Sequence, residues 1–381
     1  MVADVDTAGS GAPRHRAALI GCGRIGSLLE DDPLRGKPCT HAGAMSALAD
    51  RLALVALCDV DAARLAAAGE RWGVPALYRS AAEMLAAERP DIVVVAAPTR
   101  LHAALTMEAS RCGARGVLCE KPLAWSVDEA RKMIRHCRER GTALLINHER
   151  RFDPHFRLAR RLIRDGQIGP VRSLVGKVVT AFGKDLAQGV RADAWRCPDE
   201  DGDLVGHGPL AHDGTHLIDA IRFLTGAEVS WVSARVDVDS AARIDHSAAA
   251  LLELTGGAHV FLEAGGRRDY FEFSLEVDGR DGRLRIGNGI WELALGQTSA
   301  RYTGFRDLVP GQPPAPSADE QLAANPWVGA VAELLDAVDG GREPESSGAD
   351  GLAALSVIAA IHQSARTGRP VLMEHPGSPA V

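Results

Sequence analysis

The stretch Ala17 to Glu30, AALIGCGRIGSLLE, decides the fold of the first third of the chain. An apolar run leads into the spacing G-x-G-x-x-G and then into a helix-like segment, Ser27 to Glu30. The first glycine permits a tight turn, the second lets a pyrophosphate approach the backbone, and the third lets helix and strand pack closely. The pattern therefore predicts a strand, a glycine turn and a helix that bind a dinucleotide. The cofactor contacts predicted in this turn are Gly21, Gly23, Arg24, Ile25 and Gly26.

A second apolar segment, Leu52 to Cys58, ends in Asp59. A carboxylate at that point accepts hydrogen bonds from both ribose hydroxyls and repels a 2′-phosphate, so the sequence predicts NAD rather than NADP. The alternative is a glycine turn in an α/β protein that binds no nucleotide.

Strands continue to alternate with helices of about ten residues up to residue 148, which predicts a parallel, doubly wound sheet. Ligands of such sheets bind beyond the carboxyl ends of the strands. The residues that follow Ile92 to Ala96 and Gly116 to Cys119 are therefore expected beside the cofactor. These residues are Pro98, Thr99, His102, Glu120 and Lys121.

Beyond Val171 the strands alternate apolar and polar residues between glycine turns, which predicts a mostly antiparallel sheet in an α/β domain. Gly296 to Gln321, rich in proline and polar residues, is predicted to be a long loop. Two closing helices, Asn325 to Val338 and Asp350 to Arg366, must pack back on the domains. We therefore expect a disordered leader (1–16), an NAD-binding domain (17–148) and a substrate-binding and oligomerisation domain (149–381).

One predicted helix, Pro209 to Leu224, places His212, His216 and Asp219 close to one face. His216 is the better candidate for a general base, with Asp219 or His212 as its partner. Three alternatives stay open. The histidines, together with His207, have a metal-ligand spacing, although no further ligand motif supports zinc. Either histidine could be a core residue, and Asp213 could be the partner carboxylate although it points in another direction.

A basic helix, His155 to Arg164, has arginines on one face, which indicates a solvated surface or, alternatively, a contact with a substrate phosphate.

Composition narrows the class of protein. A net charge of -7 without a sustained basic tract argues against nucleic acid as a partner. The sequence has no apolar segment long enough to span a bilayer and no apolar core of a signal peptide, so we expect a cytoplasmic protein. The seven cysteines are scattered and form no C-x-x-C pair, as expected of structural thiols in a reducing compartment.

With these motifs in place, the chain resembles the Gfo/Idh/MocA family of sugar and cyclitol oxidoreductases, from Ala17 to Met373. The motifs are the glycine turn, Glu120-Lys121-Pro122, the stretch from Arg151 to Pro154 and the histidine helix. The resemblance implies a Rossmann domain joined to an α/β domain whose open sheet forms the interface of a homodimer or homotetramer. It also implies that Lys121 hydrogen-bonds the reacting hydroxyl while His216 removes its proton. The implied substrate contacts are Lys121, Arg151, His212, Asp213 and His216.

This sequence departs from the family pattern D-x-G-x-H, because His212 stands where the aspartate is usual. The leading interpretation is an NAD-dependent dehydrogenase acting on a ring hydroxyl or ketone of a sugar, cyclitol or sugar derivative. A second is a glycoside-cleaving enzyme that keeps and recycles its NAD, and a third is a redox-inactive nucleotide-binding sensor. Substrate specificity is expected from Asp31 to Thr40, Lys184 to Val205 and the segment after Gly296.

Overall fold

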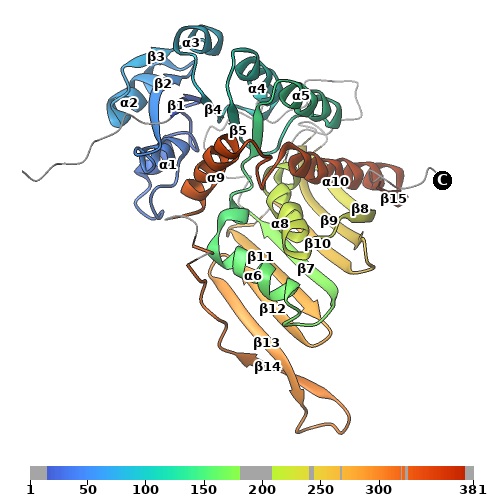
Figure 1. Cartoon of the computed structure of the whole chain (residues 1–381). Helices are drawn as coiled ribbons and strands as arrows, with labels where there is room; N and C mark the ends of the chain where they lie inside the picture. Colours follow the sequence, from blue (N-terminus) through green and yellow to red (C-terminus); the bar gives the residue numbers. More distant parts are fainter. Residues whose placement is uncertain are drawn as a thin grey trace, which may run out of the picture.

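The computed structural model describes residues 15–180, 208–239, 244–266, 268–318, 320–321 and 325–373. Two sheets, each covered by helices, make up the molecule, and the first lies above the second in Figure 1. Among the described residues, no helix has both the length and the apolar character needed to cross a membrane. The predicted specificity segment Lys184 to Val205, and His207, lie outside the described residues.

The first sheet has six parallel strands in the order β3-β2-β1-β4-β5-β6, which confirms the predicted doubly wound fold. Its strands are β1 (His15–Ile20), β2 (Leu52–Cys58), β3 (Ala76–Tyr78), β4 (Ile92–Val95), β5 (Gly116–Cys119) and β6 (Ala143–Ile146). The helices between them are η1 (Leu28–Asp31), α1 (His41–Ser46), α2 (Ala62–Trp72), α3 (Ala81–Glu88), η2 (Thr99–Leu101), α4 (His102–Arg111) and α5 (Val127–Glu139).

Local sequence explains where these helices begin and end. The side chain of Asp61 accepts a hydrogen bond from the backbone of Arg64 at the start of α2, and Gly73 ends that helix with φ of +64°. Every residue of β4 and β5 is buried, because helices cover both faces of a parallel sheet.

Two boundaries in this half differ from the sequence prediction. The segment Ser27 to Glu30 forms a hydrogen-bonded turn and the short 3₁₀ helix η1 rather than an α-helix. Strand β1 begins at His15, so the last two residues of the predicted leader belong to the sheet, and the rest of that leader lies outside the described residues.

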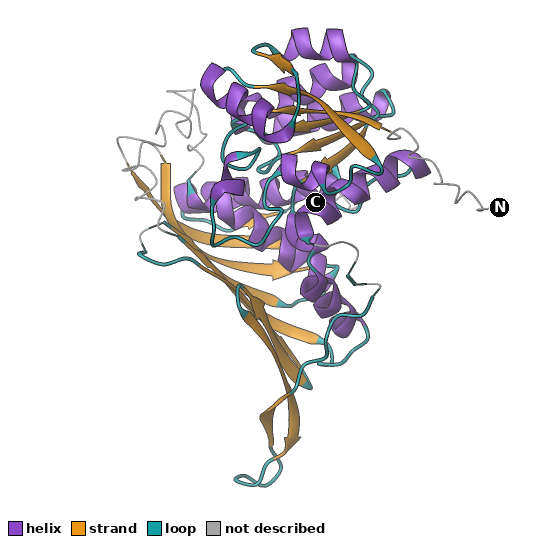
Figure 2. Ribbon diagram, turned by 90° about the vertical axis from the view of Figure 1, so that its left-hand side faces the viewer, coloured by secondary structure: helices purple, strands orange, loops and turns teal. Residues whose placement is uncertain are grey.

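The second sheet has nine strands in the order β14-β13-β12-β11-β7-β10-β9-β8-β15. Strands β7 and β10 are parallel and the other neighbours are antiparallel, which confirms the mostly antiparallel prediction (Figure 2). The strands are β7 (Val171–Val179), β8 (Val229–Asp239), β9 (Ile244–Leu254), β10 (His259–Gly265), β11 (Glu272–Gly279), β12 (Gly282–Gly287), β13 (Ile290–Thr298), β14 (Arg306–Gly311) and β15 (Val371–Leu372).

The predicted loop from Gly296 to Gln321 was wrong in its first part. It contains the end of β13 and all of β14, which pair with each other and project from the sheet (Figure 1). Residues of β14 are mostly exposed, so this hairpin lacks the alternation of buried and exposed positions that marks a half-buried strand.

The helices of the second half are η3 (Glu149–Phe152), α6 (Pro154–Arg164), the π-helical turn η5 (Leu210–Gly214), α8 (Thr215–Thr225), α9 (Pro326–Gly340) and α10 (Gly348–Thr367). Helices α6, α8 and α10 pack on one face of the second sheet. Helix α9 instead packs in the core of the first sheet, although it lies near the end of the chain (Figure 1).

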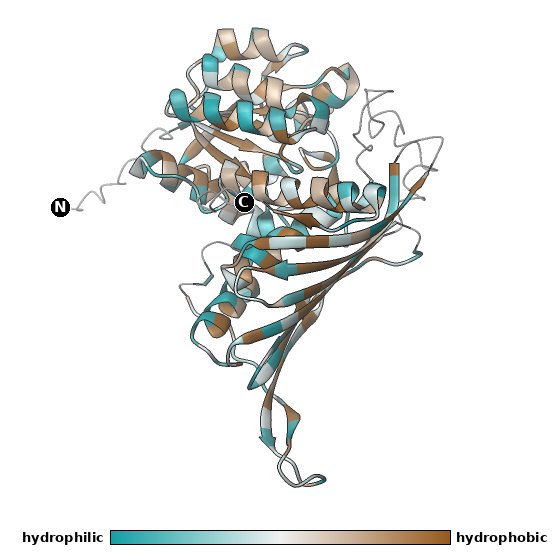
Figure 3. Ribbon diagram, turned by 90° about the vertical axis from the view of Figure 1, so that its right-hand side faces the viewer, coloured by the Kyte–Doolittle hydropathy of each residue, from teal (hydrophilic) through white to brown (hydrophobic). Residues whose placement is uncertain are grey.

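The opposite face of the second sheet carries a row of exposed apolar side chains. Phe261 is 53% exposed and pairs across the sheet with Val175 and Leu251, which are 47% and 37% exposed. Figure 3 shows apolar residues recurring along these strands. Such a row on one sheet face is typical of an interaction surface.

Candidate active site

In the glycine turn after β1, the first and third glycines have no room for a side chain, whereas the middle glycine has free space beside it. A Cβ on Gly21, whose φ is +100°, would collide with the carbonyl of Ala96, and one on Gly26 would collide with the carbonyl of Gly21. A Cβ on Gly23 would meet nothing nearer than the Arg64 guanidinium at 3.6 Å. Backbone packing therefore explains the outer glycines, and the space at Gly23 fits the approach of a pyrophosphate. Arg24 and Ile25 lie within the same turn.

Asp59 is held beside this turn in a fixed position. Its carboxylate accepts hydrogen bonds from the backbone N–H of Cys22 at 2.8 Å and of Asp61 at 2.9 Å. The Arg64 Nη1 atom lies 3.6 Å away. The acidic group expected to bind a ribose is thus oriented by backbone donors next to the open glycine.

The predicted cofactor residues after β4 lie in two different environments. Pro98 and Thr99 begin the short helix η2 at the carboxyl end of the sheet. His102 is buried, and its two ring nitrogens lie 2.8 Å and 2.9 Å from the carbonyl oxygens of Ala97 and Pro122. Burial lowers the pKa of His102. This histidine therefore joins two loops rather than presenting a ring nitrogen to a cofactor.

Glu120 is a buried anion that fixes the backbone beside Lys121. Its carboxylate lies 2.8 Å from His41 Nε2 and accepts hydrogen bonds from Asn147 at 2.7 Å and from the Lys121 N–H at 3.2 Å. Burial alone would raise the pKa of Glu120, but the partner His41, aided by Lys121 and Asn147, lowers it to about 2. Neither His41 nor Asn147 carries a local signal for this contact in the sequence, because both are far from Glu120 along the chain.

Lys121 brings the first domain into contact with the histidine helix. Its Nζ atom donates a 2.7 Å hydrogen bond to the backbone carbonyl of His212 in the π-helical turn η5. Helix α8 then carries His216 on its first turn. π-helical turns are frequent at functional sites, and this one widens the start of the predicted helix.

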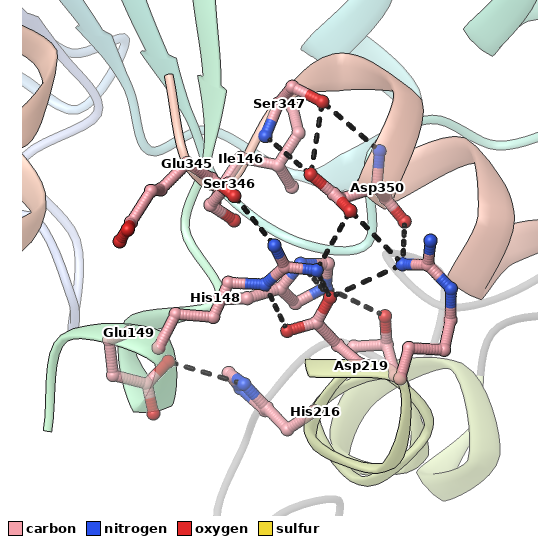
Figure 4. Close-up of polar contacts among 12 residues, drawn as sticks. Ile146, His148, Glu149, His216, Asp219, Glu345, Ser346, Ser347 and Asp350 are labelled. Atoms are coloured by element: carbon pink, nitrogen blue, oxygen red, sulfur yellow. Dashed lines mark hydrogen bonds and ion pairs between the residues drawn. The ribbon is translucent and has the colours of Figure 1, made fainter. Parts of the chain in front are cut away.

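His216 faces a carboxylate that the helix spacing did not reveal. Its Nδ1 atom lies 3.2 Å from Oε2 of Glu149, at the start of η3 (Figure 4). Burial, together with the positive charges of Lys121 and Arg150, lowers the pKa of His216 well below its usual value. Burial has the opposite effect on a carboxyl group and raises the pKa of Glu149. The imidazole is thus neutral and able to accept a proton.

Asp219, predicted as a partner of His216, is instead engaged by other side chains. The Arg151 guanidinium donates to both its oxygens, at 2.8 Å and 2.6 Å, and His148 Nδ1 lies 3.4 Å away (Figure 4). Arg151 also donates to the carbonyl of Glu345 at 2.6 Å and pairs with Asp350 at 2.9 Å. The expectation that Arg151 contacts substrate is therefore not supported, because its guanidinium is committed to this buried network.

Arginines of α6 also pair within the protein. Arg157 and Arg161 each lie 2.6 Å from a carboxylate, that of Glu345 and that of Glu320. These pairs favour the surface interpretation over a phosphate contact. Asp213 lies in η5. Burial lowers the pKa of Arg150, and the negative charge of Asp213 only partly opposes that shift.

Within the described part of the chain, no group of three or more His, Cys, Asp or Glu side chains has a geometry that could hold a metal ion.

Fold and site together define a dinucleotide-binding protein of two domains, in which a lysine from one domain meets a histidine helix from the other. Comparison with known proteins agrees with this class. Residues 15–148 match the model of an oxidoreductase family with an NAD-binding Rossmann fold, and residues 156–285 match the GFO/IDH/MocA C-terminal domain.

Three relatives illustrate the match. A D-apiose dehydrogenase from Paraburkholderia graminis is 31% identical over 94% of this chain and 89% of its own length. An inositol 2-dehydrogenase from Rhizobium meliloti is 29% identical over 93% of this chain and 98% of its own. The crystal structure of an aldose-aldose oxidoreductase from Caulobacter crescentus has a TM-score of 0.74 at 27% identity, covering 94% of this chain and 99% of that one. The chain belongs to the Gfo/Idh/MocA family of oxidoreductases.

Proposed function

We propose that the protein is an NAD-dependent dehydrogenase that acts on a ring hydroxyl or ketone of a sugar, a cyclitol or a sugar derivative. The observation that carries this proposal is the meeting of Lys121 and the histidine helix at the carboxyl edge of the Rossmann sheet. The named relatives, which include a D-apiose dehydrogenase and an inositol 2-dehydrogenase, support the substrate class.

The cofactor would lie across the open glycine turn with its adenosine ribose at Asp59. A carboxylate held by the Cys22 and Asp61 N–H groups can still accept from the ribose hydroxyls and opposes a 2′-phosphate. NAD is therefore preferred over NADP. Bound NAD supplies a nicotinamide ring that accepts a hydride from the substrate carbon.

Two side chains, Lys121 and His216, act on the reacting hydroxyl of the substrate. In this proposal the side chain of Lys121, held by the carbonyl of His212, hydrogen-bonds the reacting oxygen and stabilises negative charge that develops there. The neutral imidazole of His216 accepts the proton, and its low pKa keeps it unprotonated before reaction. His212 contributes its backbone carbonyl, which orients Lys121.

The exposed row of Val175, Leu251 and Phe261 supports a homodimer or homotetramer that buries this face of the second sheet. Light scattering would show a mass of at least twice 40.3 kDa, and a monomer would contradict this part of the proposal.

The function is tested by following reduced nicotinamide absorbance while the purified protein and NAD are mixed with inositols, free sugars, glycosides and nucleotide sugars. We expect the signal to grow with one group of compounds. If NAD binds and no signal grows, net oxidation of the panel is excluded. Cleaved glycosides in the same mixtures would then identify the oxidation-elimination alternative.

A further inference from the structure

The histidine helix lacks the carboxylate that the family pattern places four residues before the histidine, and the structure shows what takes its place. His212 stands at that position, and Asp219 is committed to Arg151. Among the described residues, the carboxylate that lies within 4.0 Å of a His216 ring nitrogen is Glu149, at 3.2 Å. It comes from the junction after β6, 67 residues earlier in the chain.

Neighbouring contacts fix the distance between the two chain segments that carry Glu149 and His216. His148, which precedes Glu149, lies 3.2 Å from the hydroxyl of Thr215, which precedes His216. Arg151, two residues after Glu149, holds Asp219, three residues after His216. The junction and the helix are thus tied together on both sides of the pair. Because these ties are buried, the two segments keep Glu149 next to His216 before any ligand binds. The contact is at ion-pair distance, and the Nδ1 atom of His216 makes no hydrogen bond to the described residues, so a small rotation of either side chain completes the proton path.

We propose that Glu149 is the final proton acceptor of the site and receives the substrate proton through His216. This inference rests on the proposed dehydrogenase function. The substrate O–H bond breaks as an Nε2–H bond forms on His216, and the Nδ1–H bond breaks as an O–H bond forms on Oε2 of Glu149. The electron pair of the substrate O–H bond becomes part of the new carbonyl, while the hydride leaves to NAD. Glu149 ends as a carboxylic acid and His216 ends neutral.

Charges around the pair favour this direction of transfer. Burial is the largest influence on His216 and disfavours an imidazolium, as do the cations Lys121 and Arg150 and the imidazoles of His148 and His212. The Glu149 carboxylate, when ionised, acts in the opposite sense. Burial is the largest influence on Glu149 and favours its protonated form, and the charge of Glu120 adds to this. Arg150 and Lys121 act in the opposite sense on Glu149 and are outweighed.

The first test compares Glu149→Gln, which keeps the shape of the side chain but cannot take up a proton, with wild type. We expect kcat to fall by about 10²-fold or more, which is the usual range for a lost acid-base group. The acidic limb of the wild-type kcat profile, which reports ionisation of Glu149, should disappear in the variant. Glu149→Asp should keep that limb with an intermediate kcat, and Glu139→Gln, an exposed carboxylate on α5, should change neither. A Glu149→Gln enzyme with wild-type kcat, or a slower one that keeps the same limb, would overturn the proposal.

A second readout needs no turnover. In ¹⁵N-histidine spectra of the NAD-bound protein, with His216 assigned by its loss in His216→Gln, both ring nitrogens should shift with pH as Glu149 ionises, without the signature of an imidazolium. Glu149→Gln should abolish this step. Its absence in wild type would contradict the pairing. If the wild-type protein shows this shift but oxidises no compound of the panel, the pairing of Glu149 with His216 stands and the proposed dehydrogenase function is refuted.

Discussion

Two sides of helix α8 carry ionisable residues three positions apart, and they behave differently. Asp219 is 1% exposed and receives two hydrogen bonds from Arg151, with Arg222 and His148 beside it. His216 faces one carboxylate at 3.2 Å and is surrounded by cations that keep it neutral. The ion pairs of Asp219 anchor the helix to the domain junction. Among the described residues, His216 has a single carboxylate neighbour, Glu149, and is therefore available to react. The comparison indicates that the two roles can be separated by substitution.

The largest expected effect lies on the His216 side. His216→Ala and Lys121→Met should each lower kcat by about 10³-fold, since each removes a group that handles the hydroxyl proton or its charge. The Kd for NAD, measured by fluorescence titration, should stay within about threefold. His155→Ala, on the surface of α6, is the matched control. Full activity in His216→Ala would show that the base is another residue.

The opposite result is expected on the Asp219 side. Asp219→Ala leaves the buried Arg151 short of its main partner and should lower the free energy of unfolding by about 4 kcal/mol in urea titrations. Asp336→Ala removes an exposed partner of Arg51 and should cost less than about 1 kcal/mol. If the two losses are equal, the network does not anchor the helix.

Glu120 is a carboxylate beside Lys121 whose hydrogen-bond partners are all within the protein, so it resembles Asp219 rather than Glu149. Its pKa is lowered from 4.5 to about 2, so it stabilises the fold above pH 4.5 and loses that contribution as the pH falls toward 2. The contribution is about 3 kcal/mol. The difference in unfolding free energy between wild type and Glu120→Gln should therefore shrink by about that amount from pH 5 to pH 2. A difference that is constant with pH would show that the charge of Glu120 contributes nothing.

The smallest effect is expected at the cofactor turn. Asp59→Asn removes the charge next to Arg64, and its single amide oxygen can accept from the N–H group of Cys22 or of Asp61 but not from both. The ratio of NADP to NAD affinity should rise about tenfold, measured as the two Kd values, because the repulsion of a 2′-phosphate is lost. Glu70→Gln, on the same helix as Arg64 and exposed, should leave the ratio unchanged. Tighter NADP binding by wild type would refute the choice of cofactor.

Much of the fold could be predicted because its elements carry local signals. Buried apolar strands, the glycine turn and the alternation of strands with helices of about ten residues predicted the Rossmann half nearly element by element. Alternation of apolar and polar residues predicted most strands of the second sheet. The β13–β14 hairpin could not be found in this way. Its strands are stabilised by pairing with each other and with β12 rather than by a buried face, so the polar sequence looked like a loop.

Prediction of the site was limited by distance along the chain. Helical spacing identified His212, His216 and Asp219 as neighbours on one helix. Spacing alone cannot show that the guanidinium of Arg151 binds the carboxylate of Asp219. Glu149 stood in the sequence directly after a predicted strand, where functional residues of parallel sheets gather. Its relation to His216 depends on how two domains meet, which no local pattern encodes.

Helix α9 has a consequence for how the polypeptide is made. Its side chains Val331, Leu334 and Leu335 complete the core of the first sheet on the side of β5 and β6, yet they follow most of the second sheet in the order of synthesis. During synthesis on the ribosome, the apolar face of the first sheet that α9 covers therefore stays exposed until residues 326–340 have been made. A fragment that stops at residue 148 would expose that surface and is expected to aggregate when expressed alone.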